Sequence, residues 1–326
     1  MKNHNPKISI IIPTYNRSNI LIDISIKSVL QQNYNNWELL IIDDGSTDDT
    51  SALCKKLTEE DKRISYFYQQ NSGQGVARNF GIKKSLGEFI LLLDSDDYIL
   101  PDMIKNHIDL IEANNYDYIS CKRWIFNHQK GLININPANP SCIIYKKKLF
   151  ELLGYFDESK EMRGIEDTDL EFNWGSKIKN YNIKYKSLDI PLVIYLEHDN
   201  QETSHIDIKK LKNRTDSIIE KYIKSKIISK NDFSLKYKES GNFNLLTGDM
   251  RIGRKKLIKS LEYKFNLQAF ILLLMSFFGS KIYNKFVYFI KIIREKTLYK
   301  LNLLKNIKKY PDIYKQVLYV TSTYYK

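Results

Sequence analysis

The chain has 326 residues, of which 43% are hydrophobic and 13% aromatic, and this composition excludes an intrinsically disordered chain. Its net charge of +13 is uneven, because residues 1–200 carry 24 basic and 28 acidic side chains, whereas residues 201–326 carry 27 and 10. The three cysteines form no paired motif, which argues against a disulfide framework and indicates a reducing compartment.

The first hundred residues alternate between strand and helix patterns. They start with a polar segment that leads straight into a strand, so we expect no signal peptide. Continuous apolar runs predict strands buried on both faces of a parallel sheet, at 7–12, 37–42, 64–68 and 88–93. Helical spacing predicts helices at about 19–32, 48–60 and 73–85, with 46–49 supplying capping residues and first-turn acids to the second. We therefore predict a doubly wound α/β sheet with right-handed crossovers, which binds ligands at the carboxyl ends of its strands.

After residue 115 the pattern becomes mixed. It predicts short strands at 117–125, 141–145 and 192–197, and a helix that follows Glu166. Beyond His198 the sequence is helical and rich in lysine. The uncharged stretch between Lys264 and Lys281 has 16 residues, fewer than the roughly 20 that cross a bilayer.

An acidic cluster ends the fourth predicted strand: Asp94, Ser95, Asp96 and Asp97. Three carboxylates this close repel one another unless a cation lies between them. Mg²⁺ and Mn²⁺ are hard ions, and such an ion takes one or two carboxylates together with substrate phosphates. The alternative for this cluster is a solvated acidic turn.

Polar residues also follow the other strand ends. Asp44 can accept hydrogen bonds from a ribose hydroxyl or a base N–H, or it can belong to a turn and helix cap. Residues 13–17 offer an aromatic face, and Arg78, early in a helix, can approach a diphosphate or lie on the surface. The chain holds no P-loop and no G-x-G-x-x-G pattern, so neither a P-loop site nor a dinucleotide site is expected.

Four acids open the helix near residue 166: Glu166, Asp167, Asp169 and Glu171. The helix dipole alone can explain acids at this end. The catalytic alternative needs one of these carboxylates to act as a general base. His198 follows the last predicted core strand and is either structural or a metal ligand.

In order and spacing, these segments resemble the family-2 inverting glycosyltransferases of the GT-A fold, the bacterial cell-surface polysaccharide type. The resemblance covers about residues 6–200 through 11–17 (IIPTYNR), 43–48 (DDGSTD), 75–81 (GVARNFG), 87–97 (GEFILLLDSDD), 154–158 (GYFDE) and 166–170 (EDTDL). It implies a GT-A nucleotide-diphospho-sugar transferase domain at 1–205, followed by a mostly helical basic extension at 206–326. The implied enzyme is a hexosyl- or N-acetylhexosaminyltransferase that moves a sugar, expected from a UDP-sugar donor, to a hydroxyl of a cell-surface glycan or lipid-linked acceptor.

The resemblance also implies roles for single residues. Asp96 would bind Mn²⁺ or Mg²⁺, and His198 matches a histidine that binds metal in part of the family. Asp167 would be the base, and Glu166 would support the acceptor side. The remaining implied contacts are with the nucleotide-sugar, from Pro13, Thr14, Tyr15, Arg17, Asp44, Arg78, Asp94 and Ser95, with Asp44 reading the base. Residues 139–153 would shape the acceptor site, whereas 122–140 match no familiar pattern.

The basic tail has two main interpretations. Basic side chains near anionic lipid contribute about 1 kcal/mol each, so the tail can hold the protein on a membrane surface. The alternative is a helical subdomain that packs on the catalytic domain or on a second copy of the chain. No nucleic-acid-binding motif occurs, so nucleic acid is not an expected partner. We expect a cytoplasmic protein, peripheral on the inner face of the cell membrane.

Two rival functions stay open on the sequence. A sugar-phosphate nucleotidyltransferase is expected to carry a glycine-rich N-terminal loop, which residues 13–17 lack. A non-catalytic glycan- or nucleotide-binding protein on the same fold is the other rival. The presence of Asp94, Asp96 and Asp167 counts against it.

Overall fold

The chain divides into two compact units, Met1–Gln201 with Leu303–Lys326, and Glu202–Asn302. They are described separately. The computed structural model describes residues 5–127, 131–136, 139–197, 221, 230–246, 248–289, 309, 312–313, 315–317 and 321.

Four parallel strands form one half of the sheet in the first unit, in the order β3-β2-β1-β4. Their bounds are β1 (Ile8–Thr14), β2 (Trp37–Asp43), β3 (Ile64–Tyr68) and β4 (Phe89–Leu92). Along β1, Ile10 and Ile12 pack in one buried cluster and Ile11 packs in another, so both faces of the sheet are covered. The parallel strands predicted from the apolar runs are confirmed.

The other half of the sheet combines parallel and antiparallel pairs, and most of its strands come from the part of the chain after residue 115, where the sequence pattern becomes mixed. The order continues from β4 as β8-β6-β9-β5, with β7 beside β6. The pairs β4–β8, β8–β6, β6–β7 and β9–β5 are antiparallel, and β6–β9 is parallel. No helix separates β6 from β7 along the chain, and consecutive strands without a crossover helix pair antiparallel. The bounds are β5 (Asp97–Ile99), β6 (Tyr118–Asn127), β7 (Gly131–Asn136), β8 (Ile143–Lys146) and β9 (Tyr185–Glu197).

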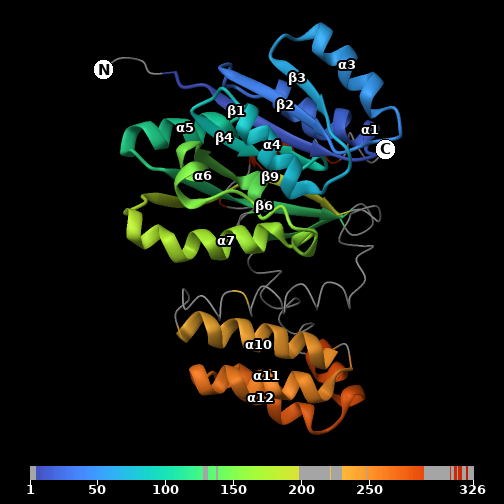
Figure 1. Cartoon of the computed structure of the whole chain (residues 1–326), viewed down its shortest axis with the longest axis vertical. Helices are drawn as coiled ribbons and strands as arrows, with labels where there is room; N and C mark the ends of the chain where they lie inside the picture. The colour runs from blue at the N-terminus through green and yellow to red at the C-terminus, as the bar shows by residue number, and fades with distance from the viewer. Residues whose placement is uncertain are drawn as a thin grey trace. The chain divides into compact units, whose positions relative to one another are not determined.

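Helices cover both faces of this sheet, which gives three layers (Figure 1). On one face lie α1 (Ser18–Ile20), a π-helical turn (Leu21–Ile26), α2 (Lys27–Leu30), α3 (Thr50–Glu60) and α5 (Met103–Asn114). On the other lie α4 (Gln74–Lys84), α6 (Lys148–Leu153) and α7 (Glu166–Lys177). Short 3-10 turns occur at Pro140–Cys142, Lys160–Met162 and Ile178–Tyr181.

The start of α3 corrects one detail of the sequence interpretation. The helix begins at Thr50, so no acid lies in its first turn. Asp48 instead accepts the backbone N–H of Thr50 at 3.1 Å, next to the helix start. The polar residues at 46–49 therefore organise the turn before the helix.

The carboxyl end of β1 is the point where its two neighbours diverge. With β2 the pairing runs on to Thr14 and Asp43, whereas with β4 it stops at Ile11 and Leu92. The loops after β1, β2 and β4 all leave the sheet at this edge. Ligands of open α/β sheets bind at such an edge, where strand order reverses.

The second unit is helical in its described residues. Its helices are α10 (Lys230–Leu246), α11 (Met250–Tyr263) and α12 (Leu267–Ser276), followed by helical residues 280–289. Leu245, Leu257, Ala269 and Tyr283 form its buried core. Among the helices described, none combines the length and the hydropathy that crossing a membrane requires.

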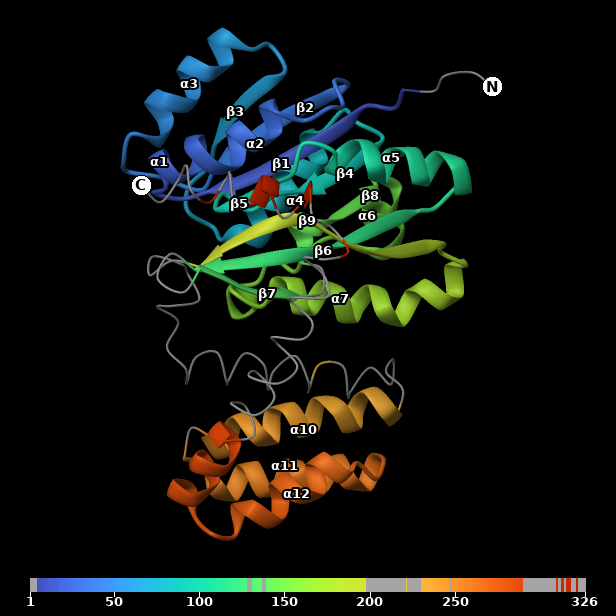
Figure 2. The ribbon, with the colours of Figure 1, turned by 180° about the vertical axis from the view of Figure 1, so that it is seen from behind.

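The end of the chain, Leu303–Lys326, groups with the first unit. From the sequence we instead expected one continuous extension at 206–326. Val317 is buried among Trp124, Ile194 and Leu196, and Lys309 Nζ lies 2.9 Å from Asp189 Oδ2. Figure 2 shows the described part of this segment, in red, near β9. The pattern of apolar residues in the tail therefore includes positions that complete the first unit's core.

Candidate active site

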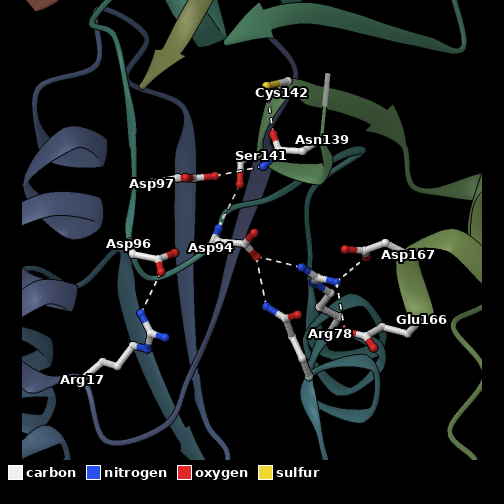
Figure 3. A network of polar contacts seen from close by, with 11 residues as sticks. Arg17, Arg78, Asp94, Asp96, Asp97, Asn139, Ser141, Cys142, Glu166 and Asp167 are labelled. Atoms are coloured by element: carbon white, nitrogen blue, oxygen red, sulfur yellow. Dashed lines mark hydrogen bonds and ion pairs between the residues drawn. The ribbon is translucent and has the colours of Figure 1, made fainter. Parts of the chain in front are cut away.

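The acidic turn Asp94–Asp97 leaves β4 at the carboxyl edge of the sheet. Its backbone is held in place, because the Asp94 N–H donates to Ser141 Oγ at 3.1 Å and Ser25 Oγ donates to the Ser95 carbonyl at 3.3 Å. The side chains of Asp94 and Asp96 stay partly accessible, at 22% and 14%. The turn therefore presents two carboxylates from a fixed backbone (Figure 3).

Each of these carboxylates is paired with an arginine. Arg17, just after β1, donates from Nη1 to Asp96 Oδ2 at 2.7 Å. Arg78 on α4 donates from Nη2 to Asp94 Oδ1 at 2.7 Å, and Gln74 Nε2 donates to the same oxygen at 3.1 Å.

Arg78 also reaches the first turn of α7. Its Nη1 donates to Asp167 Oδ1 and lies 3.8 Å from Glu166 Oε1. Burial alone would lower the pKa of this guanidinium, but Asp167, Asp94 and Glu166 raise it, so Arg78 stays charged. Residues 94 and 167, far apart in the sequence, thus belong to one ion network, as Figure 3 shows.

Asp167 sits in an environment that suits a base. Desolvation raises the pKa of Asp167 to about 7, while 42% of its side chain stays accessible. Arg78 lowers the pKa, whereas Glu166 and Asp94 raise it. Glu166 itself is buried, and its Oε2 has no hydrogen-bond partner among the residues described. A carboxylate with a pKa near neutrality can take a proton from a hydroxyl.

The loops after β1 and β2 are tied together. The backbone N–H of Asn16, a residue with a left-handed φ of 51°, donates to Ser46 Oγ at 2.8 Å, and Thr47 N donates to Asn16 Oδ1 at 2.7 Å. The Asp44 N–H donates to the Thr14 carbonyl at 2.8 Å. Thr14 is buried, while Tyr15, the next residue, is 47% exposed.

The Asp44 carboxylate accepts three hydrogen bonds from protein donors. Ser72 N and Gln69 Nε2 donate to Oδ1 at 2.8 and 2.7 Å, and Gly73 N donates to Oδ2 at 2.8 Å. These bonds fix the loop that leads into α4 and its Arg78. The role of Asp44 in reading a base stays a prediction.

Gln74, Asn139 and Ser141 contact the acidic turn, although no individual role in it was predicted for them. Asp97 is buried, and desolvation followed by repulsion from Asp94 and Asp96 raises its pKa to about 8. Asn139 Nδ2 donates to Asp97 Oδ2 at 3.1 Å, so residues 139–141 lie against the turn. Gln74 lies inside the G-x-G stretch, so a sequence motif could have indicated it. The contacts of Asn139 and Ser141 with the turn form only in the folded chain, so no motif indicates them.

A divalent cation fits the chemistry of this turn but would need ligands from elsewhere. In the part of the chain that the structure describes, no three His, Cys, Asp or Glu side chains come together as a metal-binding set. His198 lies outside the described residues. Asp96 and Asp94 offer carboxylate oxygens, and Mg²⁺ and related ions take only one or two of these when phosphates complete the shell.

A family model for glycosyl transferase family 2 matches residues 9–172, which include the strands and loops of this site. The chain belongs to this family. Its GT-A fold follows from this membership and from the solved structures that share it.

The chain matches curated relatives over part of their length. An uncharacterized glycosyltransferase of Rickettsia conorii is 53% identical over 113 residues, 34% of this chain and 18% of that protein. A GalNAc(5)-diNAcBac-PP-undecaprenol beta-1,3-glucosyltransferase of Campylobacter jejuni is 41% identical over 97 residues, 29% of this chain and 31% of that protein. The chain thus matches about a fifth of the length of the Rickettsia relative.

Solved structures extend the similarity at the level of fold. Residues 1–349 of S. aureus TarS, in complex with UDP-GlcNAc, superpose with a TM-score of 0.51 at 19% identity, over 78% of this chain and 73% of that fragment. A mannosyltransferase of Pyrobaculum calidifontis, in complex with GDP-Man and Mn²⁺, gives 0.55 at 15% identity, over 99% and 88%. At these identities the likeness shows the GT-A fold alone.

Direct contacts join only some of the predicted site residues. The ion pairs connect Arg17 with Asp96, and Asp94 with Asp167 through Arg78. Pro13, Thr14, Tyr15 and Asp44 lie at the same sheet edge, on the loops after β1 and β2. Arg78 pairs with the carboxylates of Asp94 and Asp167, whereas from the sequence we expected it to approach a diphosphate. The substrate roles of all these residues stay predictions.

Proposed function

We propose that this family 2 enzyme is an inverting glycosyltransferase that moves a sugar from a nucleotide-sugar, expected to be a UDP-sugar, to a hydroxyl of a glycan or lipid-linked acceptor. One observation supports this most strongly: the acidic turn after β4 and Asp167 at the start of α7 share one buried arginine. A donor-binding element and a base are thus held at one sheet edge.

In this proposal Asp167 takes the proton from the acceptor hydroxyl. The acceptor oxygen then forms a bond to the anomeric carbon while the bond from that carbon to the diphosphate breaks, which inverts the configuration. Asp96 and Asp94 would hold Mn²⁺ or Mg²⁺, which neutralises charge on the departing diphosphate. Tyr15 and Asp44 would face the nucleotide, since both lie on the loops that leave this edge. His198 would be a further metal ligand.

The donor class is inferred from two similar folds. One was solved with UDP-GlcNAc and the other with GDP-Man and Mn²⁺. The acceptor class rests on the Campylobacter relative, whose name specifies an undecaprenol-linked glycan. Neither name fixes the sugar that this chain transfers.

A thermal-shift panel tests the donor. The full chain is melted with UDP-GlcNAc, UDP-glucose, UDP-galactose and GDP-mannose, each with and without Mn²⁺. A ligand at 100 times its dissociation constant stabilises the native state by about 2.7 kcal/mol, which raises the melting temperature. Because the proposed site holds the diphosphate through a divalent cation, the donor should give this shift only when Mn²⁺ is present. No shift with any nucleotide-sugar, with or without the ion, would argue against the proposal.

We also propose that the second unit contacts an anionic membrane. Apolar side chains on both sides of α12 in the sequence are exposed, including Phe265 at 68% before it, and Phe278 at 64% and Phe289 at 58% after it. Basic residues border them in the sequence, among them Lys259, Lys264, Lys281 and Lys285. An exposed apolar surface with basic neighbours matches a bilayer with acidic headgroups. Such a position would bring the enzyme to a lipid-linked acceptor.

A further inference from the structure

Arg78 is a fully buried charge whose partners lie on two different elements. Its side chain has no accessible surface, while Asp94 belongs to the turn after β4 and Asp167 to the first turn of α7. Removing a guanidinium from water costs several kcal/mol unless it is paired. The carboxylates of Asp94 and Asp167 therefore offset the cost of burying this charge.

The guanidinium joins the two carboxylates through different nitrogens. Nη2 donates to Asp94 and Nη1 donates to Asp167. Because the group is planar and rigid, the two nitrogens fix the spacing of the carboxylates they bind. A lysine ammonium has the same charge but lacks this geometry.

We propose that Arg78 is a positioning residue, which holds the Asp167 carboxylate in a fixed place relative to the donor-side carboxylate of Asp94. The inference rests on the proposed function, because it takes Asp167 as the base. Arg78 does not touch the substrate in this account, since its side chain is 0% exposed. It acts through the two aspartates.

The neighbours of Arg78 hold it in place. Its Cζ lies 5.4 Å from the centroid of the Phe156 ring. The next residue, Asn79, donates from Nδ2 to the Phe156 carbonyl at 2.9 Å and to Glu158 Oε1 at 2.8 Å, and accepts the Phe156 N–H at 3.0 Å. The segment around 154–158 is thereby fixed to α4. A side chain locked by packing and by hydrogen bonds can position a reacting group precisely.

Arg78 also sets the electrostatic environment of Asp167. The charged or titratable groups around it are Arg78 on α4, Glu166 on α7, Asp94 after β4 and Tyr145 on β8. Desolvation raises the pKa of Asp167, and the cation of Arg78 opposes this rise. Without Arg78 the pKa of Asp167 should therefore rise further.

The test is a ¹³C NMR titration of aspartate side-chain carboxyl carbons in the full chain, with the Asp167 signal assigned by its loss in Asp167→Asn. Removing an opposite charge this close raises a carboxyl pKa by roughly 1–3 units, so we expect that rise in Arg78→Gln and a smaller one in Arg78→Lys. The matched control is Arg63→Gln, which should leave the pKa unchanged. Arg63 pairs with Asp61 before β3, at the opposite end of the parallel strands.

An unchanged Asp167 titration in a folded Arg78→Gln protein would overturn the proposal. If that variant does not fold, Asp94→Asn supplies the test, because it removes a like charge and leaves Arg78 in place. The pKa of Asp167 should then fall, and an unmoved value would overturn the link. No substrate enters this measurement, so its outcome is separate from that of the proposed function.

A kinetic readout tests the positioning itself. Arg78→Lys keeps the charge but cannot span both carboxylates, and a base displaced by about 1 Å can cost ~10²-fold in rate. With the donor found by thermal shift, kcat should fall by about 10- to 100-fold while the donor KM stays within about twofold. A lysine variant with the wild-type kcat would contradict a positioning role.

Discussion

At the residue scale, Asp96 and Asp167 differ in ways that suit different tasks. Asp96 pairs with Arg17 and is 14% exposed, while Asp167 is 42% exposed with a pKa raised to about 7. A group that holds a cation should be ionised, and a base should titrate near the working pH. The environments of the two carboxylates agree with the proposed division of roles.

Asp96→Asn should weaken donor binding. The amide cannot supply the negative charge that a divalent ion needs, so we expect the dissociation constant of UDP with Mn²⁺ to rise at least about tenfold. Isothermal titration calorimetry measures it. The control is Asp109→Asn, on the exposed face of α5, which removes an aspartate paired only with Lys105 among its described salt bridges. Equal affinities for UDP in wild type and Asp96→Asn would contradict the metal-binding role.

The pKa of Asp167 predicts an acid limb in the pH profile. A base must be deprotonated, so activity should be half-maximal near pH 7, approach its plateau above that pH and fall as the pH drops below it. For one titrating group, kcat/KM should decrease tenfold per pH unit there. Measurement of kcat/KM from pH 5 to 9 checks it. A flat profile down to pH 5 would be inconsistent with Asp167 as the base.

The sequence revealed the acidic residues but not their connection. Asp44, Asp94 and Asp167 were identified because they follow strand or helix boundaries, where local patterns are informative. Arg78 lies 16 residues from Asp94 and 89 from Asp167, so its two ion pairs exist only once α4 and α7 have packed on one face of the sheet. A single sequence records no such distant contacts.

At the element scale, the packing of α4 on the sheet determines where Arg78 lies. A Cβ at Gly81 would come within 2.4 Å of Ile11 Cγ2 on β1. Gly81→Ala should therefore push α4 away and destabilise the first unit by about 1–3 kcal/mol. In contrast, a Cβ at Gly175 on α7 meets no atom within 4 Å, so Gly175→Ala should stabilise by about 0.5–1 kcal/mol.

Thermal unfolding of the two glycine variants tests this packing. The expected order of melting temperatures places Gly175→Ala above wild type and Gly81→Ala below it. A Gly81→Ala protein as stable as wild type would mean that α4 does not approach β1 so closely.

Strands with strong apolar runs were predictable, and irregular ones were not. The run at 37–42 became β2 because its side chains are buried on both faces. β5 has only three residues, too few for a pattern. β9 extends from Tyr185, well before the predicted start at 192, since irregular pairing with β6 around Lys122 accommodates Pro191 inside the strand.

At the scale of the whole molecule, the exposed apolar surface of the second unit should bind membranes. Phe265→Ser with Phe278→Ser removes two exposed rings, and burial of one such side chain is worth about 1.5–3 kcal/mol. Flotation with phosphatidylglycerol vesicles should show at least about tenfold less bound protein than wild type. Leu86→Ser is the control, because Leu86 is 78% exposed on the first unit. Equal flotation of wild type and the double variant would rule out this surface.

Point variants suit this question better than removal of the tail. Deletion of residues 260–326 would also remove Val317 from the core around Trp124, and so would damage the first unit. The basic tail predicted from charge therefore falls into both units, and its end contributes Val317 to the core of the first unit.

The central claim is that Asp167 is the base of a sugar transfer whose donor is held by the acidic turn. The most direct measurement is the rate of nucleoside diphosphate release by wild type and by Asp167→Asn, with the nucleotide-sugar that stabilises the protein and an undecaprenol-linked glycan. We expect a rate lower by about 10²–10⁴-fold in the variant, with the thermal shift from the donor retained. Release at the wild-type rate by Asp167→Asn would contradict it.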